Sequence, residues 1–235
     1  MRLPTDSQRL LIAGRTGSGK TMEALHHLSQ RSIGEKPWIC LDFKGDDLVS
    51  QIPISGMSTI HDPVPSEPGV YVVRAEIEDH DKGGPVDEYL ISIFRQGGTG
   101  LLVDEGVMLG QRNRGLRTLL TQGRSRECPL IILTQRPVNI DVYALSEAEF
   151  IQVFYIPLPD DQDKLHKHIA AERLDFDQLR NYGKYYSAWY DVLEDNLEIL
   201  QPCPPFEQIY DRILTRLPKV ETEPLQHLPP RRVRL

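Results

Sequence analysis

Short apolar runs alternate with amphipathic segments along this 235-residue chain. The runs are rich in Leu, Ile, Val and aromatic residues, which is typical of buried strands. They predict strands at 9–14, 37–43, 69–75, 100–105, 129–135, 148–158 and 184–192. Apolar residues spaced three or four positions apart predict helices at 19–33, 86–96, 114–126 and 160–174, with a short one at 46–52.

Strands separated by helices indicate an α/β fold with a mostly parallel, doubly wound sheet. The character of the chain changes after residue 200, where seven prolines surround one short helical piece. We therefore expect one globular domain over residues 1–200. Residues 201–235 are expected to form a short, irregular, proline-rich arm outside the core.

Composition narrows the class of protein further. Hydrophobic residues make up 40% of the chain, which is enough for a packed core. The net charge of −7 argues against a protein that coats nucleic acid with its whole surface. No segment approaches the roughly 20 apolar residues that cross a bilayer, and the N-terminus lacks the apolar region of a signal peptide. A cytoplasmic protein without a transmembrane segment is expected.

The segment GRTGSGKT (14–21) matches the phosphate-binding pattern G-x-x-x-x-G-K-[ST] in full, between a predicted strand and a predicted helix. Its glycines let backbone N–H groups face a phosphate, and the helix start adds the positive end of its dipole. Lys20 would reach the β- and γ-phosphates, and Thr21 would supply a hydroxyl ligand to Mg²⁺. The predicted binding residues for ATP and Mg²⁺ are Gly14, Arg15, Thr16, Gly17, Ser18, Gly19, Lys20 and Thr21.

Two adjacent acids follow the apolar run at 101–103. A phosphate loop needs a partner acid at the end of another strand, and Asp104 fits the role of holding Mg²⁺, through water, beside the nucleotide. Glu105 would take a proton from the water that attacks the γ-phosphate. The alternative is a surface acidic pair with no catalytic role, which the complete phosphate loop disfavours.

The acid pair also separates classes of phosphate-loop proteins. Small-molecule kinases need no hydrolytic Glu there, the NKxD segment of GTPases is absent, and so is the LSGGQ-like segment of transporter ATPases. A hydrolytic, motor-like ATPase remains, with a RecA-like sheet in which additional strands separate the phosphate-loop strand from the acid-pair strand. Gln135, at the end of the next strand, would contact the attacking water or the γ-phosphate.

Three segments together resemble the FtsK/HerA superfamily of DNA-pumping ATPases: GRTGSGKT (14–21), LDFKGDDL (41–48) and GRSRECPLIILTQRP (123–137). The family's second strand ends in Asp-x-Lys-Gly, which Asp42, Lys44 and Gly45 match. Its sensor strand ends in Thr-Gln-Arg-Pro, matched at 134–137. The resemblance covers roughly residues 8–195.

This resemblance implies roles for further residues. Gln135 becomes the sensor, and Arg124 becomes an arginine finger that reaches the ATP of a neighbouring subunit, with Arg126 as its rival. A finger acting in trans requires a ring, and rings of this superfamily are usually hexamers. The chain lacks the large extra domains of cellular members.

A chain of this size resembles the minimal genome-packaging ATPases of tailless, internal-membrane viruses and phages. The implied function is translocation of double-stranded DNA into a preformed capsid, in the host cytoplasm and with a place in the virion. Two alternatives stay open at this point: an assembly or secretion ATPase that does not act on DNA, and a small-molecule phosphate-loop kinase.

Arginines concentrate in one segment of this acidic chain. Five of them and no acid lie between Gly106 and Arg126. Contact with DNA phosphates in a central pore would explain them, with Arg112 and Arg114 as the main candidates; a subunit interface or a solvated helix face would also do so. The final residues, PPRRVRL, are expected to form a disordered, soluble end. The alternative is that their three arginines dock on DNA, on a capsid vertex, or on a membrane surface or membrane protein.

Overall fold

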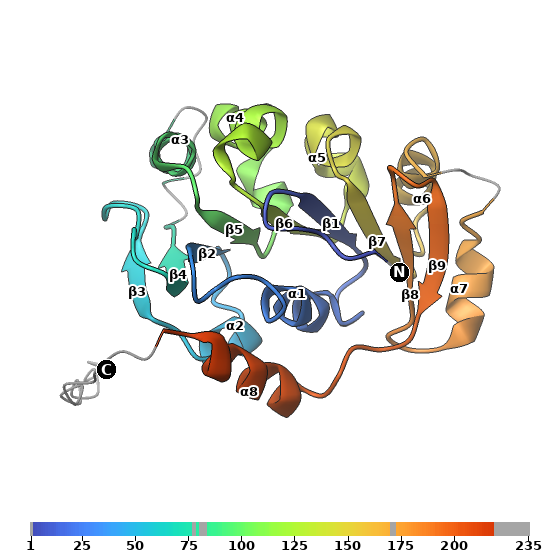
Figure 1. Ribbon diagram of the computed structural model, residues 1–235. Helices are drawn as coiled ribbons and strands as arrows, with labels where there is room; N and C mark the ends of the chain where they lie inside the picture. Colours follow the sequence, from blue (N-terminus) through green and yellow to red (C-terminus); the bar gives the residue numbers. More distant parts are fainter. Residues whose placement is uncertain (1, 77–78, 80–83, 170–172, 219–235) are drawn as a thin grey trace, which may run out of the picture.

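The computed structural model describes residues 2–76, 79, 84–169 and 173–218. Nine strands form one sheet in the order β3-β4-β2-β5-β6-β1-β7-β8-β9 (Figure 1). The strands are β1 (Arg9–Ala13), β2 (Pro37–Asp42), β3 (Gly56–Thr59), β4 (Gly69–Arg74), β5 (Gly100–Val103), β6 (Leu130–Thr134), β7 (Phe150–Phe154), β8 (Ser187–Asp191) and β9 (Asn196–Leu200). The pairs among β1 to β7 are parallel, whereas β8 pairs antiparallel with both β7 and β9.

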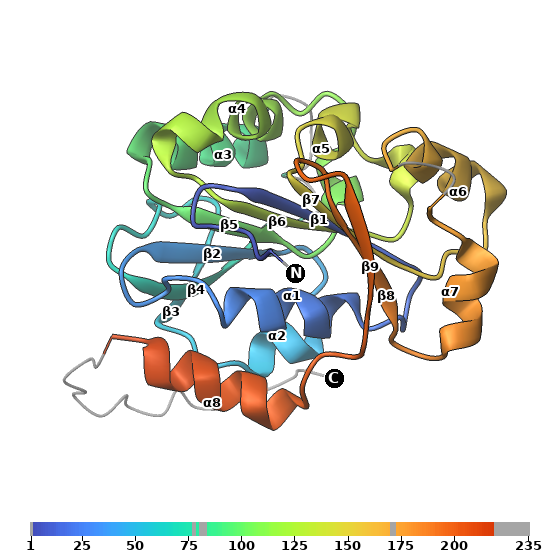
Figure 2. The same cartoon turned by 45° about the vertical axis from the view of Figure 1, so that its right-hand side comes forward.

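Helices cover both faces of the sheet. Figures 1 and 2 show α1, α2 and α8 on one face and α3, α4 and α5 on the other, with α6 and α7 beside β8 and β9. The helices are α1 (Lys20–Leu28), α2 (Asp47–Gln51), α3 (Pro85–Gln96), α4 (Arg114–Gln122), α5 (Val142–Ser146), α6 (Pro159–His166), α7 (Phe176–Tyr182) and α8 (Phe206–Arg216). The α/β, mostly parallel, doubly wound sheet predicted from the sequence is confirmed.

The core lies on both sides of the sheet because the central strands are buried on both faces. In β1, Leu11 and Ala13 pack with the apolar residues of α3 and α4. Leu10 and Ile12, one position along, pack with those of α1 and α8. This alternation follows from the period of two along a strand. It explains why the strand is continuously apolar from Leu10 to Ala13 rather than alternating with polar residues.

The predicted additional strand is present. β6 lies between β1 and β5, with Leu11 paired to Ile132 and Leu102 paired to Ile131. All three strands are parallel, so their carboxyl ends meet at one edge of the sheet. The residues that follow β1, β2, β5 and β6 therefore come together there.

Several elements differ from the sequence expectation. β3 lies within the proline-rich connection, and β9 is a partly exposed edge strand, so neither has a clear apolar run. The helix expected over 19–33 ends at Leu28, because Gln30 and Arg31 donate to carbonyls three positions back rather than four. The helix expected over 160–174 ends at His166.

The segment after residue 200 was expected to lie outside the core. Its helix, α8, instead packs against α1, and Ile209 and Ile213 are fully buried. Those two residues are four positions apart, which places them on one face of the helix. The proline-rich composition hides this short amphipathic stretch. The arginines of the terminal PPRRVRL lie outside the described residues.

Among the helices of the described ranges, none combines the length and the apolar character needed to cross a membrane.

Candidate active site

The phosphate loop connects β1 to α1 as its sequence predicts. Gly17 and Gly19 have φ angles of 73° and 100°, in the left-handed region that favours glycine. A Cβ atom at Gly14 would lie 2.7 Å from both Phe154 Cβ and Ser18 Oγ, so a larger residue does not fit there. The glycine pattern therefore reflects steric requirements of this turn. α1 begins directly after Gly19.

Lys20 lies buried at the centre of the loop. Its ammonium group donates a hydrogen bond to the carbonyl of Arg15, at 3.0 Å. Burial lowers the pKa of Lys20 to about 8, although Glu105 and Asp104 raise it in part and Lys44 lowers it further. A desolvated cation at this position gains strongly from an incoming phosphate, because the phosphate supplies the charge that water no longer provides.

The two predicted Mg²⁺ ligands face each other. Thr21 Oγ1 lies 3.5 Å from Asp104 Oδ1, although the residues are 83 positions apart. Burial raises the pKa of Asp104 to about 6, and the nearby carboxylates of Asp46 and Asp42 add to the rise. A divalent cation offsets this crowding of negative charge. A hydroxyl and a carboxylate oxygen are ligands that Mg²⁺ accepts, so these residues fit the ion.

No cluster of three or more His, Cys, Asp or Glu side chains within the described residues could hold a metal ion by itself. Mg²⁺ usually keeps water ligands and takes others from substrate phosphates. The ion would therefore arrive with the nucleotide, held by Thr21 and Asp104.

Glu105 is held from two neighbouring strands. Its Oε2 atom lies 2.5 Å from the Nζ atom of Lys44, a residue that follows β2 in the chain. The same oxygen accepts a 2.7 Å hydrogen bond from Nε2 of Gln135, the residue directly after β6. The side-chain oxygen of Gln135, Oε1, accepts a 2.6 Å hydrogen bond from the Thr16 hydroxyl. A continuous chain of contacts thus runs from Lys44 through Glu105 and Gln135 to the phosphate loop. Sequence reasoning proposed Glu105 and Gln135 but missed their contact and the Lys44 ion pair.

A turn after β2 positions Lys44. Asp42 Oδ1 accepts hydrogen bonds from the backbone N–H groups of Lys44, Gly45 and Asp46, at 3.2, 2.8 and 3.1 Å. Gly45 takes a φ of 71°, which a larger residue would adopt only with strain. The Asp-x-Lys-Gly pattern therefore encodes a tight turn that directs Lys44 at the Glu105 carboxylate. The pattern was the available sequence signal for Lys44.

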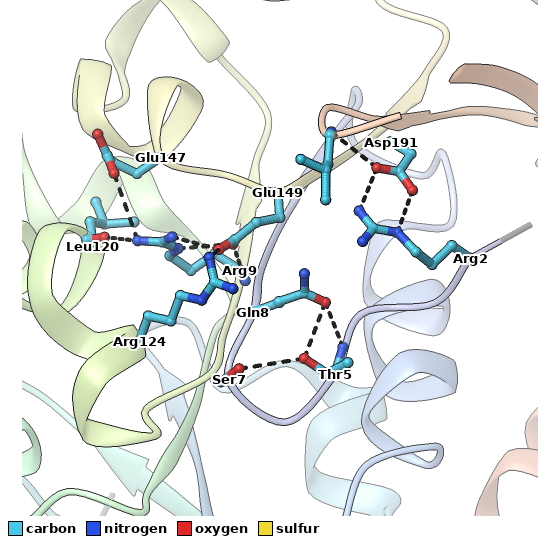
Figure 3. Close-up of polar contacts among 11 residues, drawn as sticks. Arg2, Thr5, Ser7, Gln8, Arg9, Leu120, Arg124, Glu147, Glu149 and Asp191 are labelled. Carbon is cyan, nitrogen blue, oxygen red and sulfur yellow. Dashed lines mark hydrogen bonds and ion pairs between the residues drawn. The ribbon is translucent and has the colours of Figure 1, made fainter. Parts of the chain in front are cut away.

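Arg124 and Arg126 lie in a short 3₁₀ turn, η3 (Gly123–Arg126), that precedes β6. Arg126 is engaged within the chain: its guanidinium donates to the carbonyl of Arg95 at 2.6 Å and lies over the ring of Phe94. Arg124 exposes 66% of its side chain, and Nη1 lies 4.0 Å from Glu149 Oε1. Figure 3 shows Arg124 reaching toward Glu149, which Arg9 holds through two further contacts.

These arginines stand at the opposite edge of the sheet from the phosphate loop of their own chain. Arg124 precedes β6, whereas Gln135 follows it. A five-residue strand spans roughly 17 Å. Arg124 is therefore brought near Glu149 and Arg9, and not near the phosphate loop of its own chain.

The basic segment forms a shallow groove of about 390 Å³ along α4, with Arg112, Arg114 and Arg117 in its lining. Arg112 and Arg114 are exposed. Arg117 pairs with the buried Asp141 at 2.7 Å, so part of its charge is neutralised within the chain. The groove lies apart from the nucleotide edge and offers cationic side chains to solvent.

Comparison with known proteins decides the family. The chain is 36% identical over 217 residues to DNA packaging ATPase P9 of Enterobacteria phage PRD1, covering 90% of this chain and 94% of that protein. This chain belongs to the DNA-packaging ATPase family. The assignment agrees with the FtsK/HerA-like features of the site. No protein-family model matches this packaging-ATPase sequence.

Solved structures show that this packaging-ATPase chain shares a fold with viral packaging enzymes. The genome packaging NTPase B204 of Sulfolobus turreted icosahedral virus 2, in complex with AMPPCP, superposes with a TM-score of 0.66 at 20% identity. That match covers 85% of this chain and 100% of B204. At this identity the likeness concerns the fold.

The same fold extends to ATPases of other systems. EccC of Thermomonospora curvata, in complex with a signal sequence peptide, matches with a TM-score of 0.59 at 13% identity, over 97% of this chain and 46% of EccC. The conjugation coupling protein TcpA of pCW3 matches with a TM-score of 0.54 at 15% identity, over 89% of this chain and 64% of TcpA. The fold by itself therefore does not fix what such an ATPase acts on, and the family assignment rests on the sequence relationship to P9.

Proposed function

We propose that this protein hydrolyses ATP in an oligomeric ring and uses the energy to move double-stranded DNA into a preformed viral capsid. The observation that carries the proposal is the convergence of Lys44 and Gln135 on the Glu105 carboxylate, beside a complete phosphate loop. The relationship to P9 supports the DNA-packaging role. The host cytoplasm and the virion are the corresponding locations.

The residues divide the hydrolytic work. Lys20 and the loop N–H groups bind the β- and γ-phosphates, while Thr21 and Asp104 hold Mg²⁺. When bound, Mg²⁺ neutralises charge on the β- and γ-phosphate oxygens. Glu105 accepts the proton of a water molecule as its oxygen bonds to the γ-phosphorus, and the bond from that phosphorus to the bridging oxygen of ADP breaks.

Two residues orient Glu105 for this step. The Lys44 ammonium fixes one carboxylate oxygen and offsets its charge. Gln135 donates to the same carboxylate and is itself bonded to Thr16 in the phosphate loop. Loss of the γ-phosphate after hydrolysis changes what Gln135 contacts, so this side chain reports the nucleotide state to the loop.

Arg124 completes the site of a neighbouring subunit in this proposal. Its side chain is largely exposed and stands at the edge of the sheet away from its own phosphate loop, which suits an action in trans. Arg126 is the weaker candidate because Arg95 and Phe94 engage it within the chain. An arginine finger that acts on the neighbouring subunit requires the subunits to form a ring, and we expect a ring of six.

DNA is proposed to contact the basic groove along α4. Arg112 and Arg114 are exposed and form no ion pair within the described part of the chain, so they suit phosphate oxygens. The terminal arginines are proposed to reach a capsid vertex or a membrane protein.

A nucleotide-dependent secretion or assembly ATPase is the second candidate, because the fold likeness to EccC includes this class. The discriminating experiment measures ATP hydrolysis with and without duplex DNA over a range of salt concentrations. Stimulation that weakens as salt rises supports the DNA motor. Absence of stimulation at every salt concentration supports the second candidate, and phosphate transfer to a metabolite by a monomer supports a kinase.

A further inference from the structure

A cavity of about 560 Å³ opens beside the phosphate loop, a size typical of small-molecule sites. Five parts of the chain line it: the phosphate loop with the start of α1, the start of α2 at Asp46 and Leu48, the end of β7 at Phe154, the loop before β8 at Tyr185, and the connection from β9 to α8 at Pro202–Pro205. The phosphate chemistry assigned above uses none of the last three parts. They therefore require another explanation.

The direction of a bound nucleotide points to this cavity. Gln135 and Glu105 mark the γ-phosphate end of the site, and Lys20 reaches the β- and γ-phosphates. The remainder of the nucleotide then extends away from Gln135, past Thr21 and Met22 at the start of α1. Both of those residues line the cavity.

Tyr185 stands over the phosphate loop in an unusual conformation. Its φ angle is 72°, a left-handed value that is rare for a bulky residue and carries strain. The ring approaches Gly19 so closely that a Cβ atom there would lie 3.0 Å from Tyr185 Cδ1. With 43% of the residue exposed, the ring is presented to solvent at the site. Strain of this kind persists where the surroundings hold a functional group in place.

We propose that this cavity binds the base of the nucleotide, with the base stacked on Tyr185 and enclosed by Pro202–Pro205. The inference rests on the proposed ATPase function and extends it to the base. An aromatic ring and a run of prolines present flat, apolar surfaces, which suit a planar base that stacks through its π-face. The connection to α8 thereby becomes part of the nucleotide site.

A second cavity of about 520 Å³ adjoins the first and shares Gly17, Phe154 and Tyr185 with it. Arg15, Arg180 and Lys184 are in its lining. Three cations suit an anion better than a neutral base. The two cavities therefore differ in chemistry, and the base belongs in the more apolar one.

The test compares ATP with inorganic tripolyphosphate by titration calorimetry on the full chain. Tripolyphosphate carries the phosphates without base or ribose, so it reports the phosphate loop alone. Tyr185→Ala should weaken ATP binding by about tenfold or more, from the usual worth of base–aromatic stacking, and leave tripolyphosphate binding unchanged. Tyr185→Phe keeps the ring and should bind ATP as the wild type does.

Two further variants secure the interpretation. Cys203→Trp, on the proline-rich wall, should fill the cavity and weaken ATP binding while sparing tripolyphosphate. Tyr182→Ala removes an equally exposed aromatic residue that lines neither cavity and should leave both ligands unaffected. Equal ATP affinity in the wild type, Tyr185→Ala and Cys203→Trp would overturn the base site. Equal losses for both ligands would do so too, because they would show a disturbed loop. Failure of the wild type to bind either ligand would instead overturn the proposed function.

Discussion

The Lys44 ammonium lies 2.5 Å from the Glu105 carboxylate, although the two residues are 61 positions apart. They follow β2 and β5, which pair in parallel with Leu41 beside Val103. The ion pair places a mobile side chain against a nearly buried acid, since Lys44 is 44% exposed and Glu105 is 6% exposed. Its consequence is a carboxylate with a defined orientation before any nucleotide binds.

Replacing Lys44 by Met should lower kcat and leave ATP binding nearly intact, because the base loses its orientation rather than its chemistry. A misplacement of about 1 Å costs about 100-fold in rate, which sets the expected size of the effect. Lys44→Arg should retain part of the activity. Steady-state kinetics and nucleotide titration together check this, and an unchanged kcat in Lys44→Met would rule out the orienting role.

Glu105→Gln removes the proposed proton acceptor and keeps the shape of the side chain. Hydrolysis should fall by about 10² to 10⁴-fold, as for loss of a general base, while ATP remains bound. The measurement is phosphate release under single-turnover conditions, with Gln135→Ala as a companion variant. Wild-type hydrolysis by Glu105→Gln would show that another group activates the water.

Arg124→Ala should lose hydrolysis by about 10³-fold or more and keep nucleotide binding, because an arginine finger acts on the transition state. Mixing Arg124→Ala with Lys20→Ala subunits tests action in trans. A Lys20→Ala subunit still offers its Arg124 to an intact neighbouring site, so the mixture should regain part of the activity. Arg126→Ala is the control, because Arg126 is the other candidate for the arginine finger. A mixture of Arg124→Ala and Lys20→Ala subunits that stays inactive would contradict a site shared between subunits.

The pH dependence of kcat/KM should be bell-shaped, because it reports the free enzyme. Below about pH 6 Asp104 gains a proton and loses its hold on Mg²⁺, and above about pH 8 Lys20 loses the charge that attracts phosphate. Asp46→Asn should move the acidic limb to lower pH, since the Asp46 charge contributes to the raised pKa of Asp104. Asn also keeps the cap of α2. If the acidic limb does not move in Asp46→Asn, the limb reports titration of the nucleotide rather than of Asp104.

Arg112→Ala combined with Arg114→Ala should reduce DNA-stimulated hydrolysis and leave the basal rate unchanged. Each lost phosphate contact should lower the salt slope of DNA binding by about one. Fluorescence titration of a labelled duplex over a range of salt measures this slope. A control pair on other surfaces, Arg173→Ala and Arg216→Ala, the latter on the face of the sheet opposite α4, should leave it unaltered. An unchanged slope in the α4 variant would place the DNA contact elsewhere.

Local patterns sufficed for much of the fold and of the nucleotide site. The phosphate loop is specified mainly by local backbone requirements, such as the positive φ angles of Gly17 and Gly19, so GRTGSGKT predicts its turn directly. The apolar runs predict the buried strands for the same reason, since burial on both faces requires apolar residues at every position. Edge elements such as β9, which are half exposed, leave a much weaker pattern.

The contacts between distant segments of the chain were decided by the order of the strands, because that order determines which segments lie next to each other. The pairing of β2, β5 and β6 brings Lys44 and Gln135 to Glu105, and no short segment encodes that meeting. The burial of Ile209 and Ile213 on α1 and the approach of Tyr185 to Gly19 likewise arise only when remote parts pack together. The chemistry of each functional group was thus readable from its neighbours in the chain, whereas its partners were chosen by the packing of the sheet.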